Sequence, residues 1–174
     1  MESKLVIIPS DIYNYSTIGL IKDAVENNAK RVCYITLNKT YKAMIQIFDG
    51  NSISTDNFYF VDFISPTVFT RELTNNCSFF ELSALRKFVE WFSQYIKEND
   101  IDVVFFDSLS SLLIYKTDVE SINFVNSIYS TCEEKKMSMI FLCLSEDSET
   151  SLIKQIKMMV NDVRLIRGGR KSNG

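Results

Sequence analysis

Ile101-Asp102-Val103-Val104-Phe105-Phe106-Asp107-Ser108 is a short run of apolar, β-branched and aromatic residues that ends in a carboxylate and a hydroxyl. Such a run predicts a strand that is buried on both faces and carries polar groups at its C-terminal tip. In doubly wound α/β sheets, ligands bind beyond the carboxyl ends of the strands. We therefore expect Asp107 and Ser108 to lie at the ligand edge of a sheet.

Strand-like runs alternate with segments of helical period along almost the whole chain. The strand-like runs are continuously apolar rather than alternating, which predicts a three-layer α/β sandwich with a mainly parallel central sheet flanked by helices. Residues 65–80 show no clean period and are predicted to form a loop. The predicted strands are residues 5–8, 31–37, 58–64, 101–107, 137–144 and 163–166, and the predicted helices are residues 17–28, 41–48, 81–98, 118–136 and 150–160.

The composition is that of one globular domain. The chain has 174 residues, of which 46% are hydrophobic and 24% charged, and its net charge of -3 gives no general affinity for nucleic acid or an anionic membrane. We expect a single domain over residues 1–166, followed by a basic, flexible tail over residues 167–174. No run reaches the roughly 20 apolar residues that span a bilayer, so we expect a cytoplasmic protein.

The chain has no histidine, and its four cysteines lie far apart without a C-x-x-C pair. The absence of histidine excludes the Ser-His-Asp and Cys-His arrangements and nearly every zinc-enzyme site. Two of the cysteines, Cys33 and Cys143, lie inside predicted strands. They are typical of buried thiols in a reducing compartment and do not indicate a disulfide framework or a metal site.

The segment Val103-Val104-Phe105-Phe106-Asp107-Ser108-Leu109-Ser110-Ser111-Leu112-Leu113 resembles the Walker B strand of RecA-superfamily ATPases, especially the KaiC-like and RadA-like branches of archaeal type. Those proteins have four apolar residues, Asp-Ser, and then a small and apolar stretch. The order of the other predicted elements is also similar. The resemblance implies a RecA-like, P-loop NTPase-like sheet with Asp107 and Ser108 at a nucleotide-binding strand tip.

The phosphate-binding loop of that family has no counterpart here. The family needs G-x-x-x-x-G-K-[ST] between the first strand and the first helix, because backbone N–H groups and the lysine hold the phosphates. The corresponding segment, Pro9-Ser10-Asp11-Ile12-Tyr13-Asn14-Tyr15-Ser16-Thr17-Ile18-Gly19, has one glycine at the wrong end and no lysine before Ser or Thr. The nearest cation, Lys22, lies a turn inside the predicted helix.

Two further features argue against ATP turnover. In the KaiC-like branch, acidic residues after the second strand activate the attacking water, whereas Asn38 and Lys39 stand at the matching positions. The expected ligand edge also carries mainly negative side chains, which would repel a triphosphate. We therefore predict no enzymatic activity and no bound cofactor. The acidic residues are Asp11, Asp107, Glu146 and Asp147, against Lys39 alone.

The candidate residues each have a structural interpretation beside the functional one. Asp107 either binds a magnesium-coordinated ligand or ends a buried strand and accepts hydrogen bonds. Ser108 is a cofactor-binding candidate, yet without a histidine or suitable lysine to activate it we expect turn or cap duty. Aromatic residues in predicted loops indicate a contact surface. These are Tyr13, Tyr15, Phe69, Phe79 and Phe80.

Two functional hypotheses follow. The first is a non-catalytic RecA/KaiC-like regulatory or adaptor domain that self-associates or binds a partner ATPase in a signalling or DNA-repair assembly. The second is a nucleotide-binding or ATPase domain with an unconventional phosphate site that takes ATP and magnesium. In that case Asp107 and Ser108 would form the floor of the pocket, with Ser10, Asp11 or Lys39 at its rim. A receiver domain is rejected because the first strand runs into Pro9-Ser10 rather than an acidic pair.

Overall fold

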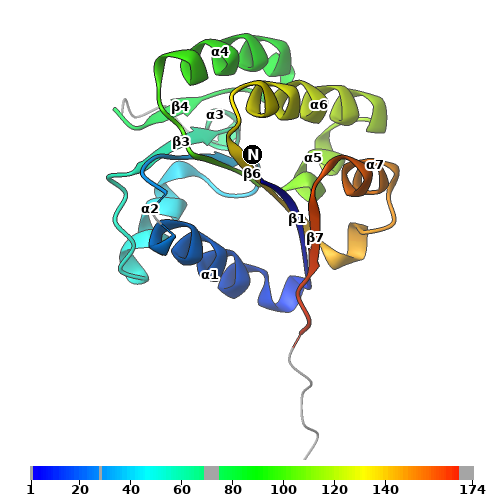
Figure 1. Ribbon diagram of the computed structural model, residues 1–174, viewed down its shortest axis with the longest axis horizontal. Helices are drawn as coiled ribbons and strands as arrows, with labels where there is room; N and C mark the ends of the chain where they lie inside the picture. Colours follow the sequence, from blue (N-terminus) through cyan, green and yellow to red (C-terminus); the bar gives the residue numbers. More distant parts are fainter. Residues whose placement is uncertain (1, 28, 69–74, 169–174) are drawn as a thin grey trace, which may run out of the picture.

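A seven-stranded parallel sheet forms the centre of the computed structural model, which describes residues 2–27, 29–68 and 75–168 (Figure 1). Its strands are β1 (Ser3–Ile8), β2 (Val32–Thr36), β3 (Phe58–Asp62), β4 (Cys77–Phe79), β5 (Val103–Asp107), β6 (Ser138–Leu144) and β7 (Asp162–Leu165). They lie in the order β4-β3-β2-β5-β6-β1-β7, and every neighbouring pair is parallel. The predicted α/β sandwich is confirmed.

Helices cover both faces of the sheet (Figure 1). One face carries α1 (Tyr13–Glu26) and α2 (Tyr41–Gly50), and the other carries α4 (Leu85–Glu98), α6 (Asp118–Glu134) and α7 (Ser151–Met159). Shorter elements are α3 (Ser65–Val68), α5 (Leu109–Tyr115) and the 3-10 turns η1 (Ser10–Ile12), η2 (Leu82–Ala84) and η3 (Ser145–Asp147). Among the described residues, no helix has the length and apolar character needed to cross a bilayer.

Successive residues of each strand enter different halves of the core. In β1, Leu5 and Ile7 pack in the layer of α4, α6 and α7, whereas Val6 and Ile8 pack with Tyr13 at the start of α1. In β5, Phe106 joins the first layer and Phe105 the second. Because side chains of a strand alternate between faces and both faces are covered, every position must be apolar. This explains the continuous apolar runs of the sequence.

The structure corrects the prediction in three places. Helix α1 begins at Tyr13, four residues before the predicted start. Strand β4 lies within the predicted loop at residues 65–80 and pairs with β3. Helix α5 was not predicted. Strand β4 is only three residues long, and so short an element is specified by its pairing partner rather than by a period in its own sequence.

The carboxylate of Asp62, at the end of β3, is completely buried and organises the loops beside it. Its Oδ2 accepts hydrogen bonds from the N–H of Tyr41, at 2.6 Å, and from the Ser65 hydroxyl. Its Oδ1 accepts from the N–H groups of Ile64 and Ser65, at 2.7 and 2.8 Å. One carboxylate therefore holds the first residues of both α2 and α3 at the C-terminal edge of the sheet.

We expect Asp62→Ala to lower the free energy of unfolding by about 2–4 kcal/mol, because buried N–H donors lose their acceptor. Urea unfolding followed by circular dichroism measures this change. Asp56→Ala is the matched control, since Asp56 is an exposed carboxylate that accepts a hydrogen bond from neighbouring Ser54. Equal midpoints for the two variants would contradict the role given to Asp62.

Candidate functional site

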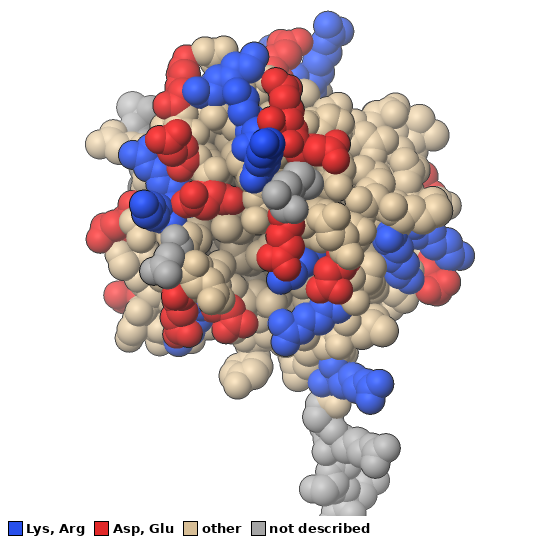
Figure 2. Space-filling view, viewed as in Figure 1, with Lys and Arg blue, Asp and Glu red and all other residues tan. Residues whose placement is uncertain are grey.

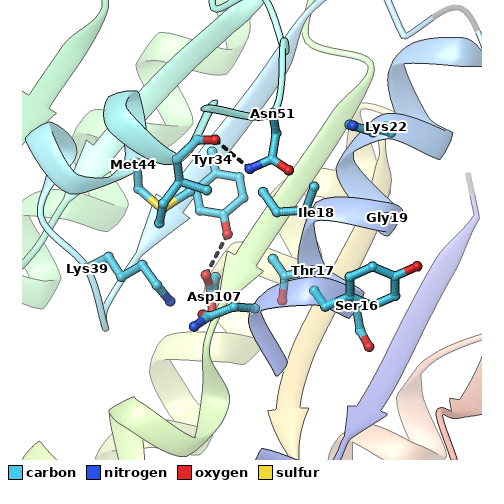
Figure 3. A pocket seen from close by; sticks show the side chains of 13 residues that line it. Ser16, Thr17, Ile18, Gly19, Lys22, Tyr34, Lys39, Met44, Asn51 and Asp107 are labelled. Atoms are coloured by element: carbon cyan, nitrogen blue, oxygen red, sulfur yellow. Dashed lines mark hydrogen bonds between the residues drawn. The ribbon is translucent and has the colours of Figure 1, made fainter. Parts of the chain in front are cut away.

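The carboxylate of Asp107 lies at the tip of the central strand β5 and accepts three side-chain hydrogen bonds, of which Figure 3 shows the one from Tyr34. Its Oδ1 accepts from the Tyr13 hydroxyl at 2.6 Å and from the Asn38 amide at 2.7 Å. Its Oδ2 accepts from the Tyr34 hydroxyl at 2.5 Å. The side chain has no exposed surface. All three donors belong to the chain itself, so the carboxylate is satisfied without a ligand.

The three donors come from a strand, the turn after it and a helix, and all three contact Asp107. Tyr34 lies in β2, directly beside Phe105 of β5, and its ring stacks on the Phe105 ring with centroids 5.7 Å apart. Asn38 follows the end of β2, which is the strand next to β5. Tyr13 is the first residue of α1 and is 7% exposed. The parallel arrangement places the C-terminal ends of β2 and β5 side by side, which is why the donors converge on Asp107.

Burial, together with the neighbouring Asp107 carboxylate, changes the acidity of the two tyrosines. It raises the pKa of Tyr13 and the pKa of Tyr34 well above the ordinary value, first through desolvation and then through the charge of Asp107. Both hydroxyls therefore keep their protons at neutral pH and remain hydrogen-bond donors. The tyrosines act as fixed donors to the carboxylate and are not poised as bases or nucleophiles.

The connection from β1 to α1 is short and tight. After Ile8 it consists of Pro9 and the 3-10 turn η1, and the helix follows at once. The Ser10 hydroxyl donates to Oε1 of Glu146 at 2.7 Å, and this contact is the first cause of a lowered pKa of Glu146. A run of acidic residues just before a helix is typical of N-terminal capping, but Glu146 does not cap α7. That helix instead begins after Thr150, without a side-chain cap, and Glu146 holds the β1–α1 connection.

The serines after Asp107 have structural duties. Ser108 is the N-cap of α5, and its Oγ accepts from the N–H of Ser111 at 3.2 Å, which confirms the predicted cap role. Ser110 is buried, and its Oγ accepts from the N–H of Leu144 at 2.8 Å. The peptide bond between Asp107 and Ser108 is cis. Ser108 is thus adjacent to Asp107 in the chain, but its hydroxyl is turned into the start of α5.

An open groove of about 470 Å³ lies beside this cluster, between α1 and α2 (Figure 3). Tyr34 and Asp107 line its floor, Ile18 and Met44 supply apolar walls, and two lysines stand at its sides. One of them, Lys39, places its Nζ 5.7 Å from the centre of the Tyr13 ring. The buried Thr17 hydroxyl next to the groove has no hydrogen-bond partner among the described residues. The second lysine is Lys22.

The structure brings together some of the residues singled out in the sequence and not others. Asp107 and Lys39 lie at one groove, whereas Ser10 and Asp11 lie in η1, outside its lining. Tyr13 and Tyr34 were missed as partners of Asp107, because no local pattern links positions 94 and 73 residues away. A tyrosine in the middle of an otherwise apolar strand was the available signal, since a buried hydroxyl needs a partner.

The predicted surface of loop aromatics is wrong for three of its five members. Tyr13 is buried in the core, and Phe79 and Phe80 are partly buried against it. Tyr15, in α1, is 85% exposed. Phe69 lies outside the described residues, as does the tail from residue 169 onward.

The described surface shows neither a patch of one charge on the face in Figure 2 nor a cluster of metal ligands. On the face in Figure 2, basic and acidic side chains are interspersed rather than gathered by sign. Within residues 2–27, 29–68 and 75–168, no group of three or more Cys, Asp and Glu side chains is placed to hold a metal ion. All four cysteines are buried and free.

The order of the sheet and the position of Asp107 at a central strand tip define an α/β protein with a RecA-like fold. Among solved structures, a KaiC-like protein from the hyperthermophilic archaeon Pyrococcus horikoshii OT3 is similar to this chain, with a TM-score of 0.70. The match covers 99% of this chain and 74% of that protein at 8% sequence identity, so it concerns the fold. No protein-family model and no curated protein match the sequence.

We expect Tyr34→Phe to lower the free energy of unfolding by about 1.5–3 kcal/mol, because a buried carboxylate loses a charge-assisted hydrogen bond. Urea unfolding at neutral pH measures it. Tyr15→Phe removes an equivalent hydroxyl from an exposed position and is expected to change stability by less than about 0.5 kcal/mol. Similar losses in both variants would argue against the described role of Tyr34.

Alkaline pH provides an independent test of the cluster. Because the pKa of Tyr13 and of Tyr34 is raised in the folded state, their contribution is fully present below the unfolded value near pH 10 and is lost as pH rises above it. Above that pH, each tyrosine steepens the fall in stability by up to about 1.4 kcal/mol per pH unit. Urea unfolding of the Tyr13→Phe/Tyr34→Phe variant should show a shallower fall than the wild type, whereas equal slopes would contradict the assignment.

Proposed function

We propose that this chain is a non-catalytic RecA/KaiC-like domain that acts as a regulatory or adaptor protein. It works by self-association or by binding a partner ATPase of the RecA/KaiC class, in an assembly of the signalling or DNA-repair type. Its partners in this proposal are proteins, without nucleic acid, a membrane or a bound cofactor.

The observation that carries the proposal is the engagement of Asp107 by its own chain. A carboxylate has about four acceptor sites, and Tyr13, Tyr34 and Asn38 fill three of them. The side chain is also fully buried. A magnesium ion needs free oxygen ligands and keeps several waters, so the residues at this tip do not fit a magnesium nucleotide.

The start of α1 gives further support. Phosphate binding at a helix N-terminus needs a loop whose backbone can approach the anion. Here Pro9 and η1 lead directly into Tyr13, whose side chain is packed in the core and bonded to Asp107. The carboxylates of Asp11 and Glu146 flank this turn. Steric filling and negative charge both disfavour a triphosphate.

Large apolar side chains on the surface favour association. Ile114 and Tyr115 at the end of α5 and Val119 at the start of α6 are 77%, 52% and 68% exposed. Exposed apolar side chains that gather in one region mark interaction sites more often than chance. A domain that presents such a region, and whose Asp107 carboxylate is already hydrogen-bonded by its own chain, is suited to binding other proteins.

The second candidate function is ligand binding in the groove between α1 and α2. The groove combines apolar walls with Lys22, Lys39 and the unpartnered Thr17 hydroxyl, a composition typical of small-molecule sites. A nucleotide bound there would place its phosphates at the lysines rather than at a P-loop. Of the residues that the alternative hypothesis gave to an unconventional phosphate site, Asp107 and Lys39 line this groove, whereas Ser108, Ser10 and Asp11 do not.

A thermal-shift titration separates the two functions. We expect no change in Tm with magnesium and ATP, ADP, GTP or cyclic nucleotides, because no phosphate cradle is formed. A ligand at about 100 times its Kd would instead stabilise the fold by about 2.7 kcal/mol. A concentration-dependent rise that Lys39→Ala abolishes and Lys42→Ala retains would overturn the proposal in favour of the groove. Lys42 is the control because it is exposed on α2 and outside the groove lining.

A further inference from the structure

The outer edge of β7 is the exposed edge of the sheet. Every residue of β7 is exposed, and Val163 and Leu165 keep 39% and 67% of their surface. The opposite edge, β4, has three residues that are buried or half-buried. Sheet edges that natural proteins leave free are usually short, bulged or protected by lysine and proline. Strand β7 is four residues long and carries two charged side chains, Asp162 and Arg164, but it has no proline and its register with β1 is unbroken.

Backbone polar groups of β7 point outward at defined positions. Ile166 donates its N–H to the carbonyl of Ile7 in β1, so even-numbered residues of this strand face β1. Because backbone groups alternate along a strand, the N–H and C=O groups of Val163 and Leu165 face away from the sheet. Another strand could pair with them without disturbing the existing hydrogen bonds.

The side chains of β7 divide by character between the two faces of the sheet. Val163 and Leu165 pair with Leu5 and Ile7, whose side chains lie on the face covered by α7. Asp162 and Arg164 lie on the other face, where both line an open hollow. Neither has an ion-pair partner among the described residues. The edge thus presents two apolar side chains on one face and two opposite, unpaired charges on the other.

We propose that β7 pairs antiparallel with β7 of a second copy of this chain, forming a continuous sheet about a two-fold axis at Val163. In this register Val163 lies opposite Val163 of the second copy, and the two exchange both backbone hydrogen bonds. Asp162 then lies opposite Arg164 of the second copy, and Arg164 opposite its Asp162. Each dimer gains two opposite-charge cross-strand pairs.

The charges of β7 indicate both which strand pairs with it, a second copy of β7, and in which register. The alternating order of Asp162 and Arg164 is self-complementary only when the strand meets an antiparallel copy of itself. In the register centred on Val163, Leu165 lies opposite Asn161 of the second copy, whose N–H donates to Ser3 of its own chain, so the outward backbone groups that pair are those of Val163. Pairing Val163 with Leu165 instead would join the backbone groups of both residues but would bring Arg164 against Arg164. Like charges directly opposite one another are destabilising, so this slipped register is disfavoured.

This inference rests on self-association, one of the two modes of action in the proposed function. Charge-reversal variants of the full chain test it. Sedimentation equilibrium over a concentration series should give the wild type a mass twice 20.1 kDa at high concentration. Arg164→Asp and Asp162→Arg should each weaken the dimer by roughly tenfold or more, because both cross-strand pairs become repulsive. An equimolar mixture of the two variants should restore the dimer. The double variant Asp162→Arg/Arg164→Asp should also form the dimer.

Lys87→Asp is the matched control, since Lys87 is exposed on α4, away from β7 (Figure 1). Hydrogen exchange should also show concentration-dependent protection of the Val163 amide. A dimer that charge reversal leaves intact would overturn this inference alone, while self-association as a function would stand. A wild type that remains monomeric at every concentration would overturn the inference and remove self-association, leaving the partner ATPase as the proposed function.

Discussion

Burial of the Asp107 carboxylate is the constraint on which the ligand edge of this sheet depends. A charged group without exposure to water is tolerated only when hydrogen bonds replace its hydration. The chain supplies them from the first residue of α1, the middle of β2 and the turn after β2. Strand, helix and turn are therefore joined at one point. At this strand tip, the oxygens of Asp107 accept hydrogen bonds from side chains of the same chain.

The same replacement explains the short connection between β1 and α1. A phosphate-binding loop must leave space above the central strand, whereas here the Tyr13 ring fills that space and the helix starts at that residue. Lys39 lies near the face of the same ring, so the cation closest to the site is held by an aromatic side chain. The polar groups of the edge serve to hold the fold together. Three further surface features are the groove between α1 and α2, the exposed apolar residues around α5 and the outer edge of β7.

Elements that are specified by their own residues were predicted from the sequence, whereas elements that are specified by distant contacts were not. The five longer helices and six of the seven strands were predicted, because each carries a hydrophobic period or a continuous apolar run in its own residues. Strand β4 and helix α5 were not, since they are short and are specified by their neighbours. The start of α1 was misplaced for the same reason. The contact between Tyr13 and Asp107 makes that helix begin early, and it joins residues 94 positions apart.

The sequence by itself determined the α/β class, the parallel sheet and the importance of Asp107 as a polar residue ending a buried strand. It also shows that residues 9–19 do not contain the G-x-x-x-x-G-K-[ST] pattern. Only the tertiary structure decided what Asp107 does, which residues line the groove and which strand forms the exposed edge. These properties depend on the order of strands in the sheet, and that order arises from packing between distant segments rather than from any local pattern.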